Sequence, residues 1–540
     1  MNLFREIFCG EEKIFSRKVL IFHVALIFAS VAFLYLFSYS TSPRYTSWGD
    51  DSAIFQAVGK AWAEGLLPYV NLFENKGPLI FFIDALGWTI APRVGIFLFQ
   101  IPAMYLSMLL LWRALGLYTS GKVKFAAAMF IMIFYATYYL DGNRTEEWSM
   151  PFLMAATYFF LRGLKNSSGG KFWCPSIVGL IDGLGFGACV LLRTTNGLPI
   201  CCYVFLTMIF LIQAREFKTL LKNILNFCAG FAVIVLPFVI YFAAHGALYD
   251  MLYGTILLNI AYSAQRENFL LTHLYIKEYA AHVAIHFLPL YLMIVVSAIE
   301  LVKNKNRLAM SLLFCSVSML IMLFKLSPYL GYCALIVPVL PIFFAVLANF
   351  AKNFRKLLST KEFSPGRMLC KFLIVFIMLY PLIIFYEAGN KIFNENSAKM
   401  REYHSEQNAY MLRLSSLIPS DERNSVMIWG EGTHASHWIL ITGIFPRCRF
   451  FSNTKAFASV DVNVKHEWLE HARADFPKWI IYSAHEGEFS GEYPDDWTKH
   501  FRQNRDVDVE SLLREKYNLT GETKIYQNYF QLYRLKDNEQ

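Results

Sequence analysis

Residues 48–83 read WGDDSAIFQAVGKAWAEGLLPYVNLFENKGPLIFFI and lie between two long apolar segments. The stretch opens with two adjacent carboxylates, Asp50 and Asp51, and closes with Lys76 in front of a Gly-Pro pair. Charged groups between apolar spans lie at a membrane surface, where they are costly and are candidates for function. The stretch therefore predicts a polar loop between membrane-spanning helices, and the rest of the chain decides which side it faces.

The composition is that of a membrane protein. Of 540 residues, 56% are hydrophobic and only 17% are charged, unlike an ordinary soluble protein. Apolar runs of about 18 or more residues recur along the chain, each long enough to cross a bilayer of roughly 30 Å. They predict an α-helical polytopic membrane protein with about eleven transmembrane helices. The expected spans are 19–39, 94–115, 123–140, 149–163, 175–192, 197–214, 223–244, 282–301, 308–325, 329–350 and 371–388.

The distribution of positive charge predicts the topology. The net charge of +9 does not indicate nucleic-acid binding, because the Lys and Arg residues cluster in alternate short loops between apolar segments. Such loops face the cytoplasm. We therefore expect a multi-pass protein of the cell (inner or plasma) membrane with a cytoplasmic N-terminus and an extracytoplasmic C-terminus. The loops at 40–93, 141–148, 245–281 and 325–332 then share the outer face.

The chain changes character near residue 390. We predict a transmembrane core at 1–389, with interfacial helices in the external loop 40–93, and an extracytoplasmic domain at 390–540. In the tail, helical patterns alternate with short runs rich in aromatic and β-branched residues, which predicts a small α/β domain. The helical patterns lie at 398–417 and 462–472, and the strand-like runs at 425–429, 478–483 and 529–534.

The first loop contains candidate catalytic residues. Asp50 and Asp51 repel each other, so one gains proton affinity or a cation holds both ionised. Either state suits a general base or a metal ligand; the alternative is two solvated aspartates after a turn glycine. Lys76 is placed to bind a lipid phosphate, or else is a lysine whose ammonium reaches the bilayer surface from a helix end.

Further candidates lie in the other outer loops. Glu146 and Glu147 precede a helix, so both can cap it, or one can cap while the other faces a site. Lys325 and the tyrosines that follow it are candidates for binding phosphate or sugar, although composition alone favours a short connecting loop. The run from Glu431 to His437 resembles a metal-ligand pattern, but helix capping and surface polarity are sufficient to explain it.

Taken in order, these residues resemble the polytopic membrane glycosyltransferases of the C-type fold (GT-C). The similarity is greatest to the bacterial branch related to protein O-mannosyltransferases and the lipid A aminoarabinose transferase. The motifs are spread over nearly the whole chain. The strongest are Asp51–Phe55, Gly65–Tyr69, Phe73–Pro78 and Gly142–Glu147, and the weaker ones are Leu192–Asn196, Ser327–Tyr329 and Val426–Gly430.

The resemblance implies an inverting hexosyl- or pentosyltransferase. Its donor would be a sugar linked to polyprenyl phosphate, and its acceptor a hydroxyl of an envelope lipid, polysaccharide or protein on the extracytoplasmic face. The resemblance favours Asp51 over Asp50 as the base. It leaves open a divalent metal ion held by Asp51 and Glu146. The remaining expected roles are donor-phosphate binding by Lys76, Arg193 and Lys325, and organisation of the site by Glu146, Glu147, Asn143 and Tyr329.

Two departures and two alternatives limit this interpretation. Many relatives have an arginine just before the Pro-Tyr of the late external motif and a histidine inside that motif, whereas this chain has Ser327 before Pro328 and Gly331 near the tyrosine. A transporter or flippase for lipid-linked sugars is one alternative function, and an assembly partner whose tail binds an envelope polymer is another. The identities of the sugar and the acceptor stay open.

Overall fold

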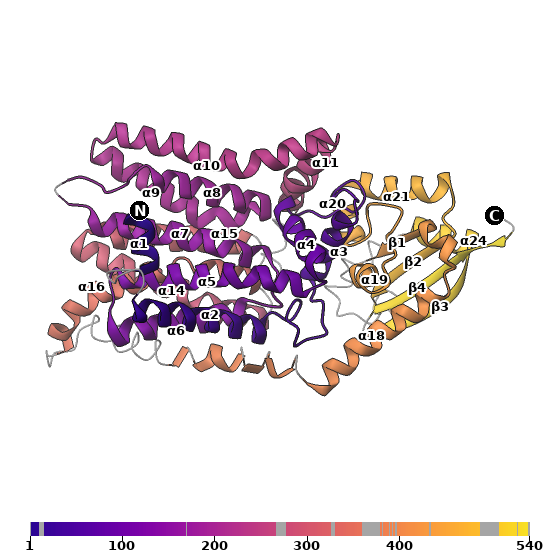
Figure 1. The fold of residues 1–540 in the computed structure, drawn as a ribbon, viewed down its shortest axis with the longest axis horizontal. Coiled ribbons are helices and arrows are strands. Elements are labelled where there is room, and N and C mark those ends of the chain that lie inside the picture. Colours follow the sequence, from indigo (N-terminus) through magenta and orange to yellow (C-terminus); the bar gives the residue numbers. More distant parts are fainter. Residues whose placement is uncertain are drawn as a thin grey trace. The chain divides into compact units, whose positions relative to one another are not determined.

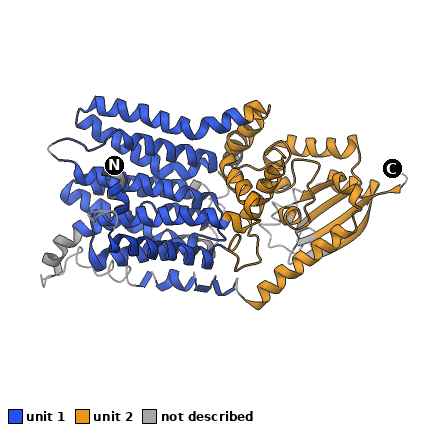
Figure 2. Cartoon of the chain, viewed as in Figure 1, with its two compact units in different colours: residues 1–38, 97–241, 266–394 blue, residues 39–96, 242–265, 395–540 orange. Residues whose placement is uncertain are grey.

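The computed structural model describes residues 2–9, 16–168, 170–265, 277–325, 330–358, 379–380, 382–387, 389–390, 392–394, 397–430, 434–485, 507–525 and 528–537. The chain forms two compact units, which Figure 2 distinguishes by colour. Unit 1 comprises residues 1–38, 97–241 and 266–394, and unit 2 comprises residues 39–96, 242–265 and 395–540. The predicted boundary near residue 390 lies close to the last of these divisions, and unit 2 also takes in two earlier segments.

Unit 1 consists of long apolar helices that run side by side (Figure 1). Among the described residues, six helices are long and apolar enough to cross a membrane. The polytopic helical fold predicted from hydropathy is thereby confirmed. The helices lying wholly or mainly in unit 1 are α1 (Asn2–Cys9), α2 (Arg17–Phe37), α5 (Val94–Gly116), α6 (Gly121–Tyr138), α7 (Thr145–Asn166), α8 (Ile177–Leu192), η1 (Thr194–Gly197), α9 (Leu198–Gln213), α10 (Phe217–Ala244), α14 (Lys277–Asn304), α15 (Arg307–Lys325), η4 (Leu330–Ile336) and α16 (Leu340–Leu358).

The predicted span at 329–350 is wrong in its first part. The chain forms the short 3-10 helix η4 there, and α16 begins only at Leu340. Pro338 explains the break, because proline has no N–H for the helical ladder and its ring clashes with the preceding turn. The Pro338 carbonyl instead accepts hydrogen bonds from the hydroxyls of Thr157 and Tyr203, both at 3.0 Å. The predicted span at 371–388 falls partly outside the described residues.

Unit 2 combines the predicted small α/β tail with two earlier segments of the chain. Its four-stranded sheet has the order β1-β2-β4-β3, with β1 and β2 parallel and the other two pairings antiparallel. The strands are β1 (Val426–Gly430), β2 (Trp479–His485), β3 (Tyr517–Ile525) and β4 (Asn528–Leu535). The helices are α3 (Asp51–Ala63), α4 (Pro78–Ile90), α11 (Leu248–Leu252), η2 (Tyr253–Leu257), α12 (Leu258–Gln265), α18 (Ala398–Ser416), η5 (Ser420–Ser425), α19 (His434–Thr442), α20 (Thr454–Val460), α21 (Val462–Ala474) and α24 (Val507–Lys516).

Helix α3 lies in the loop 40–93, where the sequence predicts interfacial helices. The helix forms, but every side chain from Ser52 to Gly59 is buried, because α4 and α19 both pack against it. Gly59 allows the close approach of α4, since a Cβ atom there would lie 2.4 Å from the Cβ of Asp84. The helix that begins at Asp51 is therefore buried within unit 2.

Arg449 joins the three chain segments that form unit 2. Its Nε and Nη2 donate to the two carboxylate oxygens of Glu467, each at 2.7 Å. Its Nη1 donates to Asp250 Oδ1 at 2.6 Å and to the Tyr69 carbonyl at 3.2 Å. Bidentate pairing of this kind is among the stronger polar interactions in proteins.

We expect Arg449→Met to destabilise unit 2, because it leaves two half-buried carboxylates without their cation. The expected loss is about 2–3 kcal/mol in the free energy of unfolding, less than for fully buried pairs. Arg447→Met is the matched control, since the Arg447–Asp475 ion pair lies on the surface and its loss should cost under about 0.5 kcal/mol. Thermal unfolding of the detergent-solubilised protein measures both; equal shifts for the two variants would contradict the prediction.

Candidate functional site

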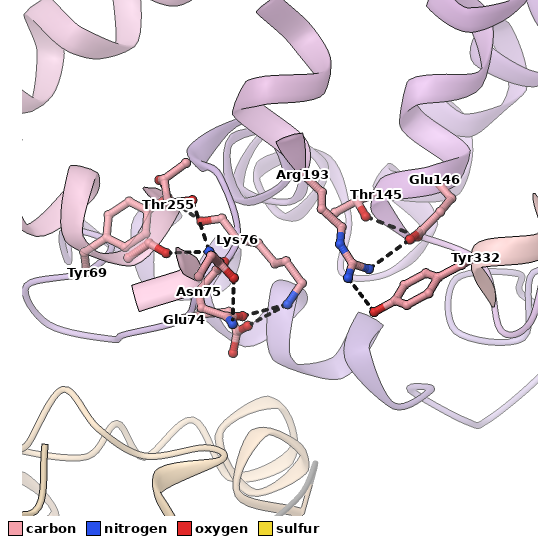
Figure 3. Close-up of polar contacts among 11 residues, drawn as sticks. Tyr69, Glu74, Asn75, Lys76, Thr145, Glu146, Arg193, Thr255 and Tyr332 are labelled. Atoms are coloured by element: carbon pink, nitrogen blue, oxygen red, sulfur yellow. Dashed lines mark hydrogen bonds and ion pairs between the residues drawn. The ribbon is translucent and has the colours of Figure 1, made fainter. Parts of the chain in front are cut away.

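Lys76 lies at the centre of a polar cluster in unit 2 (Figure 3). Its ammonium donates to Asn75 Oδ1 at 2.7 Å and to Glu74 Oε1 at 3.3 Å. It also lies 6.0 Å from the centroid of the Phe55 ring. The side chain is 19% exposed, so the ammonium is half-buried yet accessible to an anion.

Glu74 connects this lysine to the first aspartate loop. Burial raises the pKa of Glu74; Lys76 opposes that rise, and the charge of Asp51 adds to it. Asp51 and Phe55 lie one helical turn apart on α3, so they share a face. The fold therefore brings Asp51 and Lys76 around the same buried carboxylate, although 24 residues of the chain separate them.

The structure distinguishes the two neighbouring aspartates. Asp50 is exposed and precedes α3, and its carbonyl accepts the first helical hydrogen bond, from Ala53 N at 3.0 Å. Asp51 is the first helical residue and is half-buried. The charge of Asp51 is among the causes that raise the pKa of Glu74. This geometry is consistent with the preference for Asp51 over Asp50.

Two residues to which the sequence analysis assigned no role, Asn259 and Tyr69, hold the lysine loop in place. The Asn259 amide donates to the Asn75 carbonyl at 2.8 Å and accepts from Asn75 Nδ2 at 3.2 Å. The Tyr69 hydroxyl donates to the Lys76 carbonyl at 2.7 Å. In the sequence, Asn259 is an amide side chain in a mostly apolar run. In the structure it follows the π-helical turn η2, and such turns are frequent at functional sites.

Unit 1 contains a second cluster, built around Arg193 at the end of α8 (Figure 3). Its guanidinium donates to Glu146 Oε1 at 3.2 Å and to the Tyr332 hydroxyl, and it lies 4.2 Å from the centroid of the Tyr332 ring. The other oxygen of Glu146 accepts from the Thr145 hydroxyl at 3.1 Å. Two predicted residues, Glu146 and Arg193, thus form an ion pair.

Glu147 and Asn143 organise the loop that carries Glu146. The Glu147 carboxylate accepts from Asn143 N at 2.7 Å and from Gln100 Nε2 at 3.0 Å. Asn143 has φ 53° and accepts from Trp148 Nε1 at 2.9 Å. Glu147 thus points into the loop, while Glu146 faces the guanidinium of Arg193. From the sequence we considered different directions for these two carboxylates.

Three predicted contributions do not emerge from the described residues. The Lys325 side chain and Tyr329 lie outside them. Within the described part of the chain, no group of three or more His, Cys, Asp or Glu could hold a metal ion. Each oxygen of Glu146 accepts one hydrogen bond from a protein donor, and we assign no step to a metal.

The raised pKa of Glu74 predicts a pH dependence of stability. Because the folded-state pKa exceeds the usual value of 4.5, the folded protein binds this proton more tightly than the unfolded chain. The free energy of unfolding should therefore fall as the pH rises above 4.5 toward the folded-state pKa. We expect Glu74→Gln to flatten this part of the profile of unfolding midpoint against pH. The exposed Glu64, changed to Gln, should retain the wild-type slope, and equal slopes in both variants would refute the prediction.

Sequence comparison gives one family match. Residues 75–242 match the model of the dolichyl-phosphate-mannose-protein mannosyltransferase family, a range that includes Lys76, Glu146 and Arg193. This match indicates an enzyme of the glycosyltransferase type. A search of curated protein sequences finds no match.

Solved structures share the fold at low sequence identity. The Archaeoglobus fulgidus oligosaccharyltransferase tethered with an acceptor peptide aligns with a TM-score of 0.54 at 12% identity, over 96% of this chain and 74% of that chain. The oligosaccharyltransferase AglB from Archaeoglobus fulgidus, in complex with an inhibitory peptide and a dolichol-phosphate, gives a TM-score of 0.51 at 10% identity, over 97% of this chain and 75% of that chain. ArnT from Cupriavidus metallidurans bound to undecaprenyl phosphate gives 0.50 at 11% identity, over 96% and 98%. The chain is thus a polytopic membrane protein with the GT-C fold, and its residues 75–242 carry the sequence pattern of the dolichyl-phosphate-mannose-protein mannosyltransferases.

Proposed function

We propose that this protein transfers a hexosyl or pentosyl unit from a polyprenyl-phosphate donor to an acceptor hydroxyl of the cell envelope. The observation that carries the proposal is the half-buried Lys76 ammonium, gathered with Asp51 around Glu74. The family match and the lipid phosphates bound by AglB and ArnT support a donor of this class. Acceptors would be envelope lipids, polysaccharides or proteins.

The chemistry uses the two members of this cluster in different roles. Asp51 accepts the proton of the acceptor hydroxyl as that oxygen forms a bond to the anomeric carbon. The bond between this carbon and the phosphate oxygen breaks, and the charge developing on the departing polyprenyl phosphate is stabilised by Lys76. A single displacement of this kind inverts the anomeric configuration. Asn259 and Tyr69 keep the lysine loop in position.

For unit 1 we propose, independently, that Arg193 binds phosphate. A guanidinium has five N–H donors and suits phosphate geometry, and the ion pair with Glu146 fixes its direction. Glu147 and Asn143 hold the loop that carries Glu146. Lys325 and Tyr329 keep their proposed contributions to donor binding and to organising the site.

The proposed reaction takes place on the extracytoplasmic face. Support comes from the alternation of basic loops, which places residues 40–93 and the tail outside when the N-terminus is cytoplasmic. The lipid tail of the donor would then stay in the bilayer while its headgroup reaches the loop. A cysteine placed in the tail and labelled by an impermeant reagent in intact cells would report this orientation.

We expect Asp51→Asn to lower the rate of sugar transfer by about 10²–10⁴-fold, the usual contribution of a general base. Asp50→Asn is the matched control and should keep the wild-type rate within about threefold, because an exposed neighbour supplies at most a small electrostatic contribution. Purified protein is supplied with candidate polyprenyl-phosphate sugars and mixed envelope acceptors, and release of polyprenyl phosphate is measured. The configuration of the product by NMR tests inversion.

The outcomes separate the candidate functions. Turnover retained in Asp51→Asn would remove this residue from catalysis. Lack of turnover with every donor, combined with movement of lipid-linked sugar across the bilayer of reconstituted vesicles, would favour a transporter.

We expect Lys76→Gln to reduce kcat/KM for the donor by about 10²-fold, since a cation facing the leaving phosphate stabilises the transition state more than the ground state. Lys122→Gln, a change of an exposed lysine at the start of α6, is the control and should leave kcat/KM unaltered. Titration of binding by undecaprenyl phosphate alone should show weaker affinity in Lys76→Gln. An unchanged dissociation constant would refute the phosphate-binding role.

A further inference from the structure

His437 of the tail domain is buried and contacts the chain immediately before the two aspartates. It lies on α19, is 6% exposed, and its Nε2 is 3.0 Å from the Gly49 carbonyl. The helix start predicted near this residue is correct, since α19 begins at His434. The explanation by surface polarity is wrong for His437, because α18 and α3 both pack against α19.

A second buried residue fixes the protonation pattern of this imidazole. The Gln407 amide of α18 donates from Nε2 to His437 Nδ1 at 2.9 Å. A ring nitrogen that accepts a hydrogen bond carries no proton in the neutral imidazole. The proton therefore resides on Nε2, which donates to the Gly49 carbonyl. Gln407, His437 and Gly49 form one chain of hydrogen bonds with a single direction.

Contacts of other residues hold the loop on both sides of Gly49. Before Gly49, the Arg93 guanidinium lies 5.0 Å from the centroid of the Trp48 ring and donates to the Tyr45 carbonyl at 2.8 Å. After it, Asp51 begins the buried helix α3. Gly49 itself has φ 72°, a conformation accessible to glycine at little cost, and its N–H donates to Ser47 Oγ at 3.1 Å.

We propose that His437 is a positioning residue that sets the direction in which Asp50 and Asp51 leave the loop. The proposal rests on the proposed function, because Asp51 is its base. The Nε2 donor fixes the peptide group between Gly49 and Asp50, and rotation of that peptide would displace the Asp51 carboxylate from the acceptor hydroxyl. Through His437 the tail domain thus contributes to the position of the catalytic aspartates, and it is part of the catalytic unit.

The central experiment compares His437→Ala with His437→Gln. Alanine removes the donor, whereas the glutamine Nε2 can occupy nearly the same place as the imidazole Nε2. We expect His437→Ala to lower kcat by about tenfold or more, with the donor KM changed less than about twofold, because misplacement of a reacting group affects the transition state more than binding. His437→Gln should recover most of kcat. The exposed His471 of α21, changed to Ala, is the matched control.

Hydrogen–deuterium exchange gives a readout that does not depend on activity. In His437→Ala, amides of residues 49–53 should exchange about tenfold faster than in the wild type, and His437→Gln should restore protection. Gln407→Leu removes the donor to Nδ1, so the imidazole can populate both tautomers. This variant should also lower kcat and speed exchange at residues 49–53, and it replaces His437→Ala if that variant fails to fold.

Different outcomes would refute the positioning role of His437 and the proposed function. Unchanged kcat in His437→Ala, or equal losses in the alanine and glutamine variants without faster exchange at 49–53, would overturn the positioning role. If the wild type transfers no sugar from any donor, the proposed function fails, and the exchange comparison alone then decides whether His437 holds the loop.

Discussion

Unit 2 depends on the ion pairs of Arg449. This unit is assembled from three stretches of the chain, and the guanidinium contacts one residue from each, at Tyr69, Asp250 and Glu467. A charge of this kind is costly to bury unless it is fully paired, so the contacts of Arg449 stabilise the three segments in this arrangement. The loop that carries Lys76 follows Tyr69 directly. The tail domain and the candidate catalytic loop therefore form one structural unit, although they are far apart in the sequence.

The sequence predicted the features that depend on local patterns. The apolar spans, the helix beginning near Asp51 and the tail strands around Ile428 and Ile481 follow from periodicity and composition. The sequence analysis missed strand β3 because apolar and polar residues do not alternate regularly along it. Asn518, Gly521 and Lys524 are among its residues. The roles of Asn259, His437 and Arg449 could not be predicted, because each contacts residues more than 180 positions away. Local sequence singles out Asn259 and the run that ends at His437, but it does not indicate which distant residues they contact.

The two clusters share one electrostatic arrangement. In each unit a cation is paired with a glutamate that is itself buried, Lys76 with Glu74 and Arg193 with Glu146. An unpaired cation in a half-buried position would pay a large desolvation cost, and the glutamate reduces that cost. A phosphate that binds such a cation competes with the carboxylate, so an anion of higher charge is favoured over a weak one. Pairing therefore holds each cation in place. An anionic ligand has to compete with the carboxylate, so it has to interact more strongly with the cation in order to bind.

Backbone strain occurs in both clusters, as it does at other turns of the chain such as Arg215 and Lys305. Tyr69 and Asn143 are non-glycine residues with positive φ, at 69° and 53°, a conformation that costs about 1–2 kcal/mol. Each is held there by specific contacts. The Tyr69 hydroxyl donates to the Lys76 carbonyl, and Asn143 N donates to the Glu147 carboxylate. An unstrained residue would serve equally well if its only role were packing. The turns at Tyr69 and Asn143 instead set the direction of the chain that carries Lys76 and Glu146. The strain thus lies next to the residues proposed to act on the donor, where a fixed direction of the chain is most useful.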